Sequence, residues 1–219
     1  HNILEVACTF GVAKVLTVSS ADIYGVVAPE ELPIVESAPL RPVSPYAASK
    51  AAADLVALQA HLGHGQDVVR ARAFNHLGPG QSKSFVGAGF AARIVAAERS
   101  GDDELQTGDL TPRRDFTDVR DVVRAYRLLA TEGRPGVAYN ICSGTSVSIG
   151  ELAGLLLGLT DARMRLVEDP DLLRPVELPE LRGDASLLRR HTGWAPSISL
   201  DETLSDVLED WRLRLTEAQ

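Results

Sequence analysis

The sequence of 219 residues has few of the features that mark metal-binding, secreted or membrane proteins. It contains only two cysteines, Cys8 and Cys142, and their spacing is not that of metal ligands. We therefore expect reduced thiols in a cytoplasmic protein. No apolar run approaches the length of a membrane span, and no secretory segment is visible. These absences predict a protein without metal and without a membrane partner.

The sequence also lacks an excess of basic residues. It has 22 Lys and Arg against 30 Asp and Glu, a formal net charge of −8, which argues against nucleic acid or an anionic membrane surface as a partner. No repeat stands out, and the 12 prolines and 18 glycines are spread over loops rather than gathered in one linker. With 45% hydrophobic residues, the chain suits one globular domain or a two-lobed unit with a real core.

Residues 43–50, Val-Ser-Pro-Tyr-Ala-Ala-Ser-Lys, begin the most informative predicted helix, over residues 45–62. Ser44 is a good N-cap and Pro45 suits the first turn. Tyr46 and Lys50 are four residues apart, so both project from one helical face. An ammonium group next to a phenol favours the phenolate, which suits Tyr46 for acid–base work.

A tyrosine and a lysine at this spacing occur by chance in many helices, so the pattern needs its context. An apolar run over residues 15–18 ends in Ser19 and Ser20, and the helix with Tyr46 and Lys50 follows after a loop. A buried strand that ends in a hydroxyl, followed by such a helix, fits an α/β site at the carboxyl end of a sheet. Ser20 then supplies a hydroxyl for a reacting carbonyl oxygen.

At these residues the chain resembles the extended short-chain dehydrogenases/reductases, the family of nucleotide-sugar epimerases, dehydratases and reductases. The likeness rests on residues 19–25, Ser-Ser-Ala-Asp-Ile-Tyr-Gly, and on residues 44–50. It implies that Ser20 is the catalytic hydroxyl, Tyr46 the acid/base, and Lys50 the lysine that also contacts the nicotinamide ribose. NAD or NADP would be the cofactor, with Tyr46 and Lys50 as binding residues.

Residues 72–81, Arg-Ala-Phe-Asn-His-Leu-Gly-Pro-Gly-Gln, most resemble the members of this family that reduce GDP-4-keto-6-deoxy-D-mannose. By that likeness Asn75, Arg114 and Arg174 would hold the substrate diphosphate. A guanidinium suits phosphate oxygens because it bonds two at once and stays charged. Arg113 is the weaker choice beside Arg114. The family likeness also implies a homodimer whose seam uses the helix of Tyr46 and the helix that ends near Cys8.

The expected fold is α/β: a Rossmann-like parallel sheet that lacks the first βαβ units, with a smaller α/β substrate-binding lobe. Residues 1–76 and 118–145 would belong to the Rossmann-like part, which carries the Ser-Tyr-Lys triad. Residues 77–117 and 146–219 would form the substrate lobe, and we expect Trp194 to pack there. The expected strands are 14–18, 67–73, 137–141 and 163–167, and the expected helices 45–62, 85–99, 118–130, 149–159 and 200–213.

The Gly-x-Gly-x-x-Ala pattern at residues 87–92 nominally matches a dinucleotide fingerprint, but no buried strand precedes it, so we assign it to an amphipathic helix. The family's opening strand and its Gly-x-x-Gly-x-x-Gly turn, which binds pyrophosphate, have no counterpart. We therefore expect either a fragment of a longer reductase, our preference, or a protein that has lost cofactor binding.

Three other functions stay open from the sequence alone. Asp22 stands where the family's dehydratases carry an acid, so a nucleotide-sugar 4,6-dehydratase is one alternative to the reductase. A 4-epimerase is another, because the same triad serves oxidation and reduction. The third is a non-catalytic module that binds a nucleotide-sugar. In each case the expected partner is a GDP-linked or other nucleotide-sugar.

Overall fold

The computed structural model describes residues 1–172 and 178–217 as a mixed α/β protein. Its first sheet is parallel, with the order β1-β2-β6, and this confirms the predicted Rossmann-like class. β2 is buried along its whole length, and it alternates small apolar residues with Arg70 and Arg72. The strands are β1 (Val15–Ser20), β2 (Val68–Ala73) and β6 (Ala138–Ile141).

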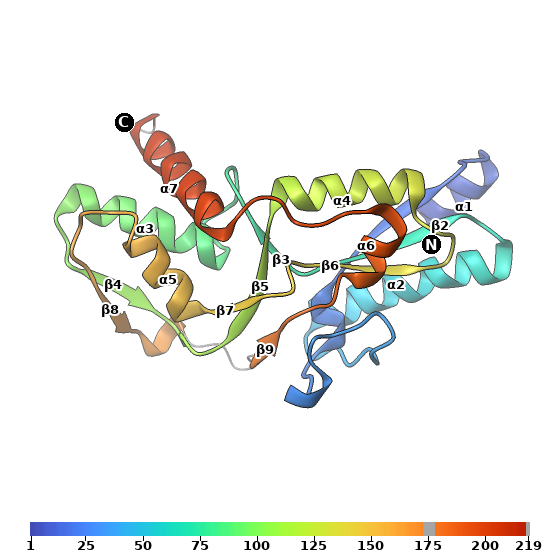
Figure 1. The fold of residues 1–219 in the computed structure, drawn as a ribbon, viewed down its shortest axis with the longest axis horizontal. Helices are drawn as coiled ribbons and strands as arrows, with labels where there is room; N and C mark the ends of the chain where they lie inside the picture. Colours follow the sequence, from blue (N-terminus) through green and yellow to red (C-terminus); the bar gives the residue numbers. More distant parts are fainter. Residues whose placement is uncertain (173–177, 218–219) are drawn as a thin grey trace.

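Two long helices cover the two faces of this sheet (Figure 1). Val69 and Ala71 share a hydrophobic core with the apolar stripe of α4 (Val119–Glu132). Because side chains alternate along a strand, Arg70 and Arg72 point to the other face, where they reach Asp54 on α2 (Pro45–His64). α1 (Asn2–Thr9) lies at the same end of the molecule and packs Leu4 near the end of α2.

The second sheet is built around β5 (Arg113–Asp118), which pairs with three short strands. It runs parallel to β3 (Asn75–Leu77) and β9 (Glu180–Leu181) and antiparallel to β7 (Ser146–Ser148). β5 passes directly into α4, so one continuous segment links the two halves of the molecule (Figure 1). None of these three partner strands was predicted from the sequence.

A second hydrophobic core lies on the far side of β5. It is formed by three helices that pack together, next to a two-stranded parallel sheet. The elements are α3 (Val86–Ser100), α5 (Ile149–Leu157), α7 (Leu200–Glu217), β4 (Glu104–Thr107) and β8 (Arg165–Glu168). The short helix α6 (Ser186–Thr192) packs with the first core instead, through Leu188.

Several helices begin at capping residues, among them Ser44, which was predicted from the sequence. The Ser44 hydroxyl accepts a hydrogen bond from the Ala47 amide at 3.1 Å, which caps α2. Ser148 and Glu151 form a reciprocal capping box at the start of α5. Asp118 caps α4. The five helix ranges predicted from the sequence are confirmed to within four residues at each end.

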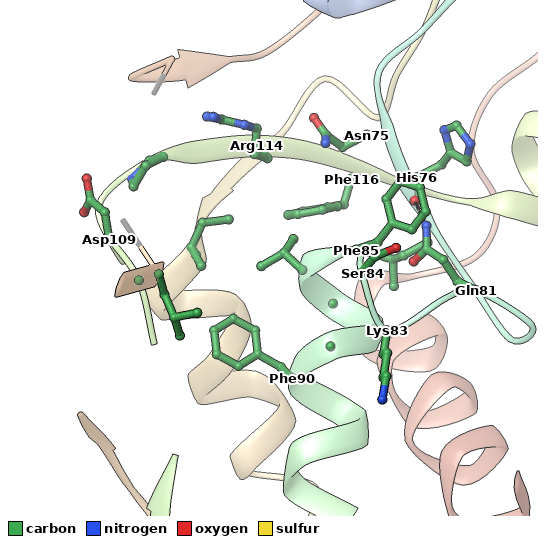
Figure 2. A pocket seen from close by; sticks show the side chains of 18 of the residues that line it. Asn75, His76, Gln81, Lys83, Ser84, Phe85, Phe90, Asp109, Arg114 and Phe116 are labelled. Atoms are coloured by element: carbon green, nitrogen blue, oxygen red, sulfur yellow. Dashed lines mark hydrogen bonds between the residues drawn. The ribbon is translucent and has the colours of Figure 1, made fainter. Parts of the chain in front are cut away.

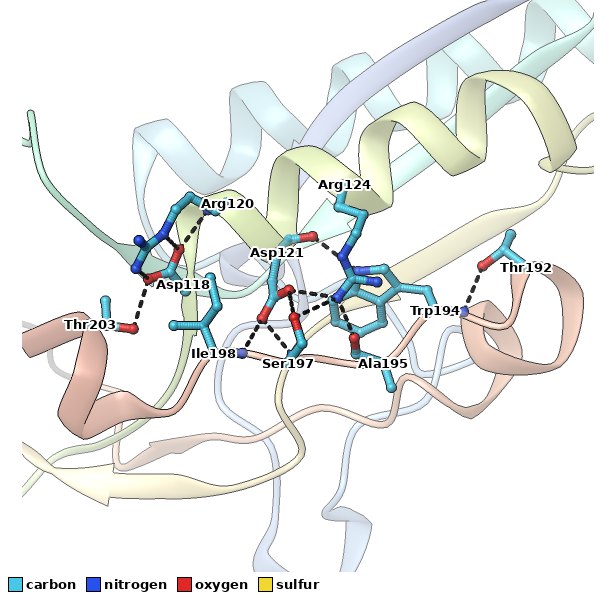
Figure 3. A network of polar contacts seen from close by, with 10 residues as sticks. All are labelled: Asp118, Arg120, Asp121, Arg124, Thr192, Trp194, Ala195, Ser197, Ile198 and Thr203. Atoms are coloured by element: carbon cyan, nitrogen blue, oxygen red, sulfur yellow. Dashed lines mark hydrogen bonds and ion pairs between the residues drawn. The ribbon is translucent and has the colours of Figure 1, made fainter.

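Two buried carboxylates at the start of α4 hold the first turn of α7 and the segment before it (Figure 3). Asp121 accepts hydrogen bonds from the amides of Ser197 and Ile198 at 2.7 and 3.0 Å. Asp118 accepts one from the Thr203 hydroxyl at 2.8 Å. Trp194 was expected to pack in the substrate lobe, but its indole lies in the first core and donates to the Asp121 carbonyl oxygen at 3.0 Å. That expectation was wrong because α4 offers this buried acceptor.

Among the helices of residues 1–172 and 178–217, none is both long and apolar enough to cross a membrane.

Candidate active site

A pocket of about 690 Å³ lies between the second sheet and α3 (Figure 2). Arg114, Phe116 and Asn75 form the wall on the sheet, and Phe90 lies on the opposite wall. The pocket combines aromatic side chains with cations and amides, a mixture that suits a ligand with both flat apolar and anionic parts.

Three of the seven residues predicted for the site line this pocket: Asp22, Asn75 and Arg114. Arg114 and Phe116 are two apart on β5, so they share one face of the sheet. Asn75 on the neighbouring strand is in register with Phe116 and joins the same face. Asp22 comes from the 3-10 turn Ala21–Tyr24, which follows β1 directly.

Arg114 is largely buried and held in place by its own strand and by the segment before β9. Its Nη1 donates to the carbonyl oxygens of Arg113 and Leu178 at 2.8 and 2.7 Å. Arg113 faces away, where it donates to the Ser146 carbonyl oxygen and pairs with Glu151. Arg114 is therefore the residue of the pair that lines the pocket. Arg174, the other predicted phosphate ligand, lies outside the described residues.

The pocket wall that α3 provides was not predicted from the sequence. The Arg93 guanidinium lies 4.9 Å from the centre of the Phe90 ring, and partial burial lowers its pKa. Lys83, in the loop before α3, adds a third cation to the lining beside Arg114 and Arg93. The Gly-x-Gly-x-x-Ala pattern lies inside α3, as expected, and residues 78–85, which separate α3 from β3, form no strand. The strand–turn–helix context of a dinucleotide fingerprint is therefore missing. An amphipathic pattern reveals such a helix but not which of its residues reach a pocket.

The predicted triad residues Ser20, Tyr46 and Lys50 do not line the pocket but lie beside it. The link is Asp22, whose amide donates to the Ser20 hydroxyl at 3.2 Å. Lys50 donates from Nζ to the Val18 carbonyl oxygen at 3.1 Å and lies 5.9 Å from the Tyr46 ring centre. Tyr46 itself is 54% exposed. The structure thus brings an accessible phenol, an ammonium group and the end of β1 to one place.

A buried polar network lies directly beneath this group. Asp54, one turn beyond Lys50 on α2, accepts hydrogen bonds from Arg70 and Arg72. Burial alone would raise the pKa of Asp54, but the two guanidinium groups outweigh it and hold the pKa below its usual range. Burial raises the pKa of Tyr24 to about 12, so its hydroxyl stays protonated and serves as a hydrogen-bond donor.

In the part of the chain that the structure describes, no three His, Cys, Asp or Glu side chains gather closely enough to hold a metal ion.

Comparison with known proteins identifies the family. The family model described as GDP-mannose 4,6 dehydratase matches residues 1–207. The chain is 42% identical over 204 residues to GDP-6-deoxy-D-mannose reductase from Pseudomonas aeruginosa, which covers 92% of this chain and 67% of that protein. It is 35% identical over 208 residues to dTDP-glucose 4,6-dehydratase from Streptomyces griseus, covering 94% of this chain and 60% of that protein.

The solved structure of RMD from Pseudomonas aeruginosa, complexed with NADPH, has the same fold with a TM-score of 0.90 at 40% identity. The match covers 97% of this chain and 71% of that one. The chain thus spans 60 to 71% of the length of these relatives. Because the family model matches all but the last residues, the chain belongs to the GDP-mannose 4,6-dehydratase family of the extended short-chain dehydrogenases/reductases.

Proposed function

We propose that the complete protein that carries this chain is an NAD(P)-dependent nucleotide-sugar reductase, which reduces the C4 ketone of a GDP-linked 4-keto-6-deoxyhexose and yields a product of the GDP-rhamnose type. One observation carries the proposal: the turn that follows Ser20 places Asp22 in the wall of a pocket that also contains Asn75 and Arg114. If the nucleotide occupies this pocket, the attached sugar extends past Asp22 toward Ser20 and the rest of the predicted triad. The similar reductase supports the choice of reaction.

The residues beside the pocket fit the nicotinamide end of a dinucleotide. Lys50 uses one N–H group on the Val18 carbonyl oxygen, and an ammonium group has three. The remaining donors, with the exposed Tyr46 hydroxyl, suit the two hydroxyls of a ribose. Tyr46 and Lys50 would therefore hold NAD(P)H, which supplies a hydride when it is bound. The adenosine end has no such set of residues in the described part of the chain.

The chain's own groups account for the proton that the reduction requires. Ser20 accepts the Asp22 amide with a lone pair, so its O–H hydrogen remains available to a carbonyl oxygen. Tyr46 donates a proton to the same oxygen as negative charge develops there. Lys50 lies on the same helical face, where its positive charge stabilises the tyrosinate left behind.

The pocket accounts for the nucleotide part of the substrate. Arg114 brings a positive charge to the pocket wall, which suits the diphosphate, and the Asn75 amide lies beside it. Phe90 and Phe85 provide apolar surface for a flat ring. Fixing the nucleotide in this way positions the sugar, which is how binding remote from the reacting carbon contributes to the rate.

A 4,6-dehydratase is the second candidate, and the position of Asp22 in the pocket wall favours it. Product analysis separates the two with the complete protein. A reductase consumes one NADPH for each molecule of GDP-4-keto-6-deoxymannose and forms a 4-hydroxy product. A dehydratase releases water from GDP-mannose and leaves the total NADPH unchanged, and a 4-epimerase inverts a 4-hydroxyl, also without net consumption. Absence of NADPH consumption with the keto-sugar would refute the reductase proposal.

We also propose that the protein is a cytoplasmic homodimer. α1, the Phe10 residue that ends it, and α2 expose apolar side chains that a second copy would cover: Ile3, Val6, Phe10, Leu55 and Leu62. The test is the mass in solution by light scattering, with a Leu62→Glu variant expected to shift the dimer toward the monomer.

A further inference from the structure

Three functional groups on one face of α2 are spaced by single turns: Tyr46, Lys50 and Asp54. The first two belong to the proposed triad, whereas Asp54 is only 1% exposed and cannot meet a substrate. Its carboxylate binds Arg72 with both oxygens, at 3.0 Å to Nε and 2.8 Å to Nη2. Arg70 adds a third hydrogen bond at 2.7 Å.

Arg72 connects this helix to the turn at the end of β1. Its Nη1 donates to the Tyr24 hydroxyl at 3.0 Å and to the Glu36 carbonyl oxygen at 2.9 Å. Tyr24 in turn donates to Asn140 at 2.7 Å. Tyr24 is the last residue of the turn that begins after Ser20 and contains Asp22. A single guanidinium thus joins the helix that carries Tyr46 and Lys50 to the turn that carries Asp22.

We propose that Asp54, Arg72 and Tyr24 are positioning residues that set the distance between the Ser20–Asp22 turn and the Tyr46–Lys50 face of α2. The inference rests on the proposed function. The network determines the geometry of the site rather than the stability of the fold. Two arginines buried with one aspartate contribute little net stability compared with apolar packing of the same volume. What the planar guanidinium adds is a fixed geometry among three elements.

The test variant is Tyr24→Phe, which keeps the buried ring and removes only the hydroxyl. Its matched control is Tyr139→Phe, because Tyr139 is equally buried and its hydroxyl also joins a network, to the Arg134 amide and His191. With the complete protein we expect Tyr24→Phe to lower kcat about ten- to hundredfold, the scale of a small misplacement of reacting groups. KM for the nucleotide-sugar and the Kd for GDP stay within twofold. Tyr139→Phe leaves kcat unchanged.

Equal losses of kcat in both variants, or an unchanged kcat in Tyr24→Phe, would overturn the inference, since a purely structural role predicts no difference between them. Arg72→Lys is the second variant: it keeps the charge but not the planar fork, so it should show the same loss of kcat at unchanged KM. If the unsubstituted protein shows no turnover, the proposed function fails and amide exchange decides the inference. The amides of Asp22 and Gly25 should then exchange faster in Tyr24→Phe only, and unchanged rates would refute positioning.

Discussion

Lys50 bridges α2 and β1, because its Nζ donates to the carbonyl oxygen of Val18, two residues before Ser20. A second hydrogen bond joins the same two elements, because the Ser19 hydroxyl donates to the Lys50 carbonyl oxygen at 3.3 Å. These two hydrogen bonds fix the helix that begins with Tyr46 against the strand that ends with Ser20. The three groups of the proposed triad therefore share one rigid support.

Tyr46→Phe should remove most turnover. The phenol is the proposed proton donor, and loss of a general acid typically costs about 10²–10⁴-fold in kcat. Binding of GDP should stay nearly unchanged, because Tyr46 does not line the pocket. The measurement is steady-state NADPH consumption by the complete protein. Tyr139→Phe is the control, since the Tyr139 hydroxyl bonds to the Arg134 amide and to His191 rather than to the triad. Turnover by Tyr46→Phe equal to that of this control would contradict the assignment.

Asp22→Asn separates the reductase from the dehydratase. A reductase needs no acid at this place, so reduction of the keto-sugar should persist within about tenfold. A dehydratase that uses Asp22 as an acid or base should lose about 10²–10⁴-fold. The Ser20 contact survives the substitution because it uses the Asp22 backbone amide. Product formation from GDP-mannose and from the keto-sugar, measured side by side, shows which reaction depends on this carboxylate.

Arg114→Gln should weaken GDP binding about ten- to hundredfold, which corresponds to the roughly 1.5–3 kcal/mol of a hydrogen-bonded charge. Calorimetry with GDP measures it directly. Arg113→Gln is the matched control, because Arg113 is engaged with Ser146 and Glu151 and does not line the pocket. Thermal unfolding of both variants checks the fold. A similar loss of affinity in the two variants would rule out a specific role for Arg114.

Asp121→Asn should destabilise the protein by about 2 kcal/mol at neutral pH, since the carboxylate accepts several hydrogen bonds that the amide cannot all accept. Burial alone would raise the pKa of Asp121, but the bonds from Arg124 and the 197–198 segment lower it below its ordinary value of 3.8. The stabilisation is therefore complete above that value and lost as the pH falls through the lowered native pKa.

Urea unfolding at pH 7 and at about pH 3 checks this prediction. The difference between wild type and Asp121→Asn should shrink at the lower pH. Asp161→Asn, which changes an exposed carboxylate, should make no difference at either pH. A gap that stays constant with pH would show that Asp121 acts by packing rather than by charge.

The sequence was sufficient for the elements whose signals are local. Ser44 with Pro45, Ser148 with Glu151, and Asp118 mark helix starts through contacts within one turn. The short strands gave no such signal. β9 has two residues and exists because Arg113 and Glu180, far apart in the chain, come into register. Pairings of this kind depend on tertiary structure that local patterns do not encode.

The site was predictable to a similar extent. Family motifs identified Asn75 and Arg114, and the structure places both in one pocket. The buried pair of Asp54 and Arg72 was missed, although two arginines alternating in an apolar strand indicate that an anion lies opposite. Arg93 gave no signal, because an arginine on an amphipathic helix is usually solvated and only the packing of α3 shows where it points.

The two hydrophobic cores have a consequence for recombination between relatives. Described members of the first core come from residues 21–74, 122–142 and 178–194, and those of the second from the intervening stretches and from α7. Neither core is a contiguous block of sequence, because the described chain passes from one core to the other five times, the third time after β6 and the last time before α7. A chimera that takes its pocket from another enzyme must therefore exchange several separate segments together. A single crossover point within these segments would give each core residues from two parents. The side chains of such a mixed core would pack in combinations that occur in neither parent.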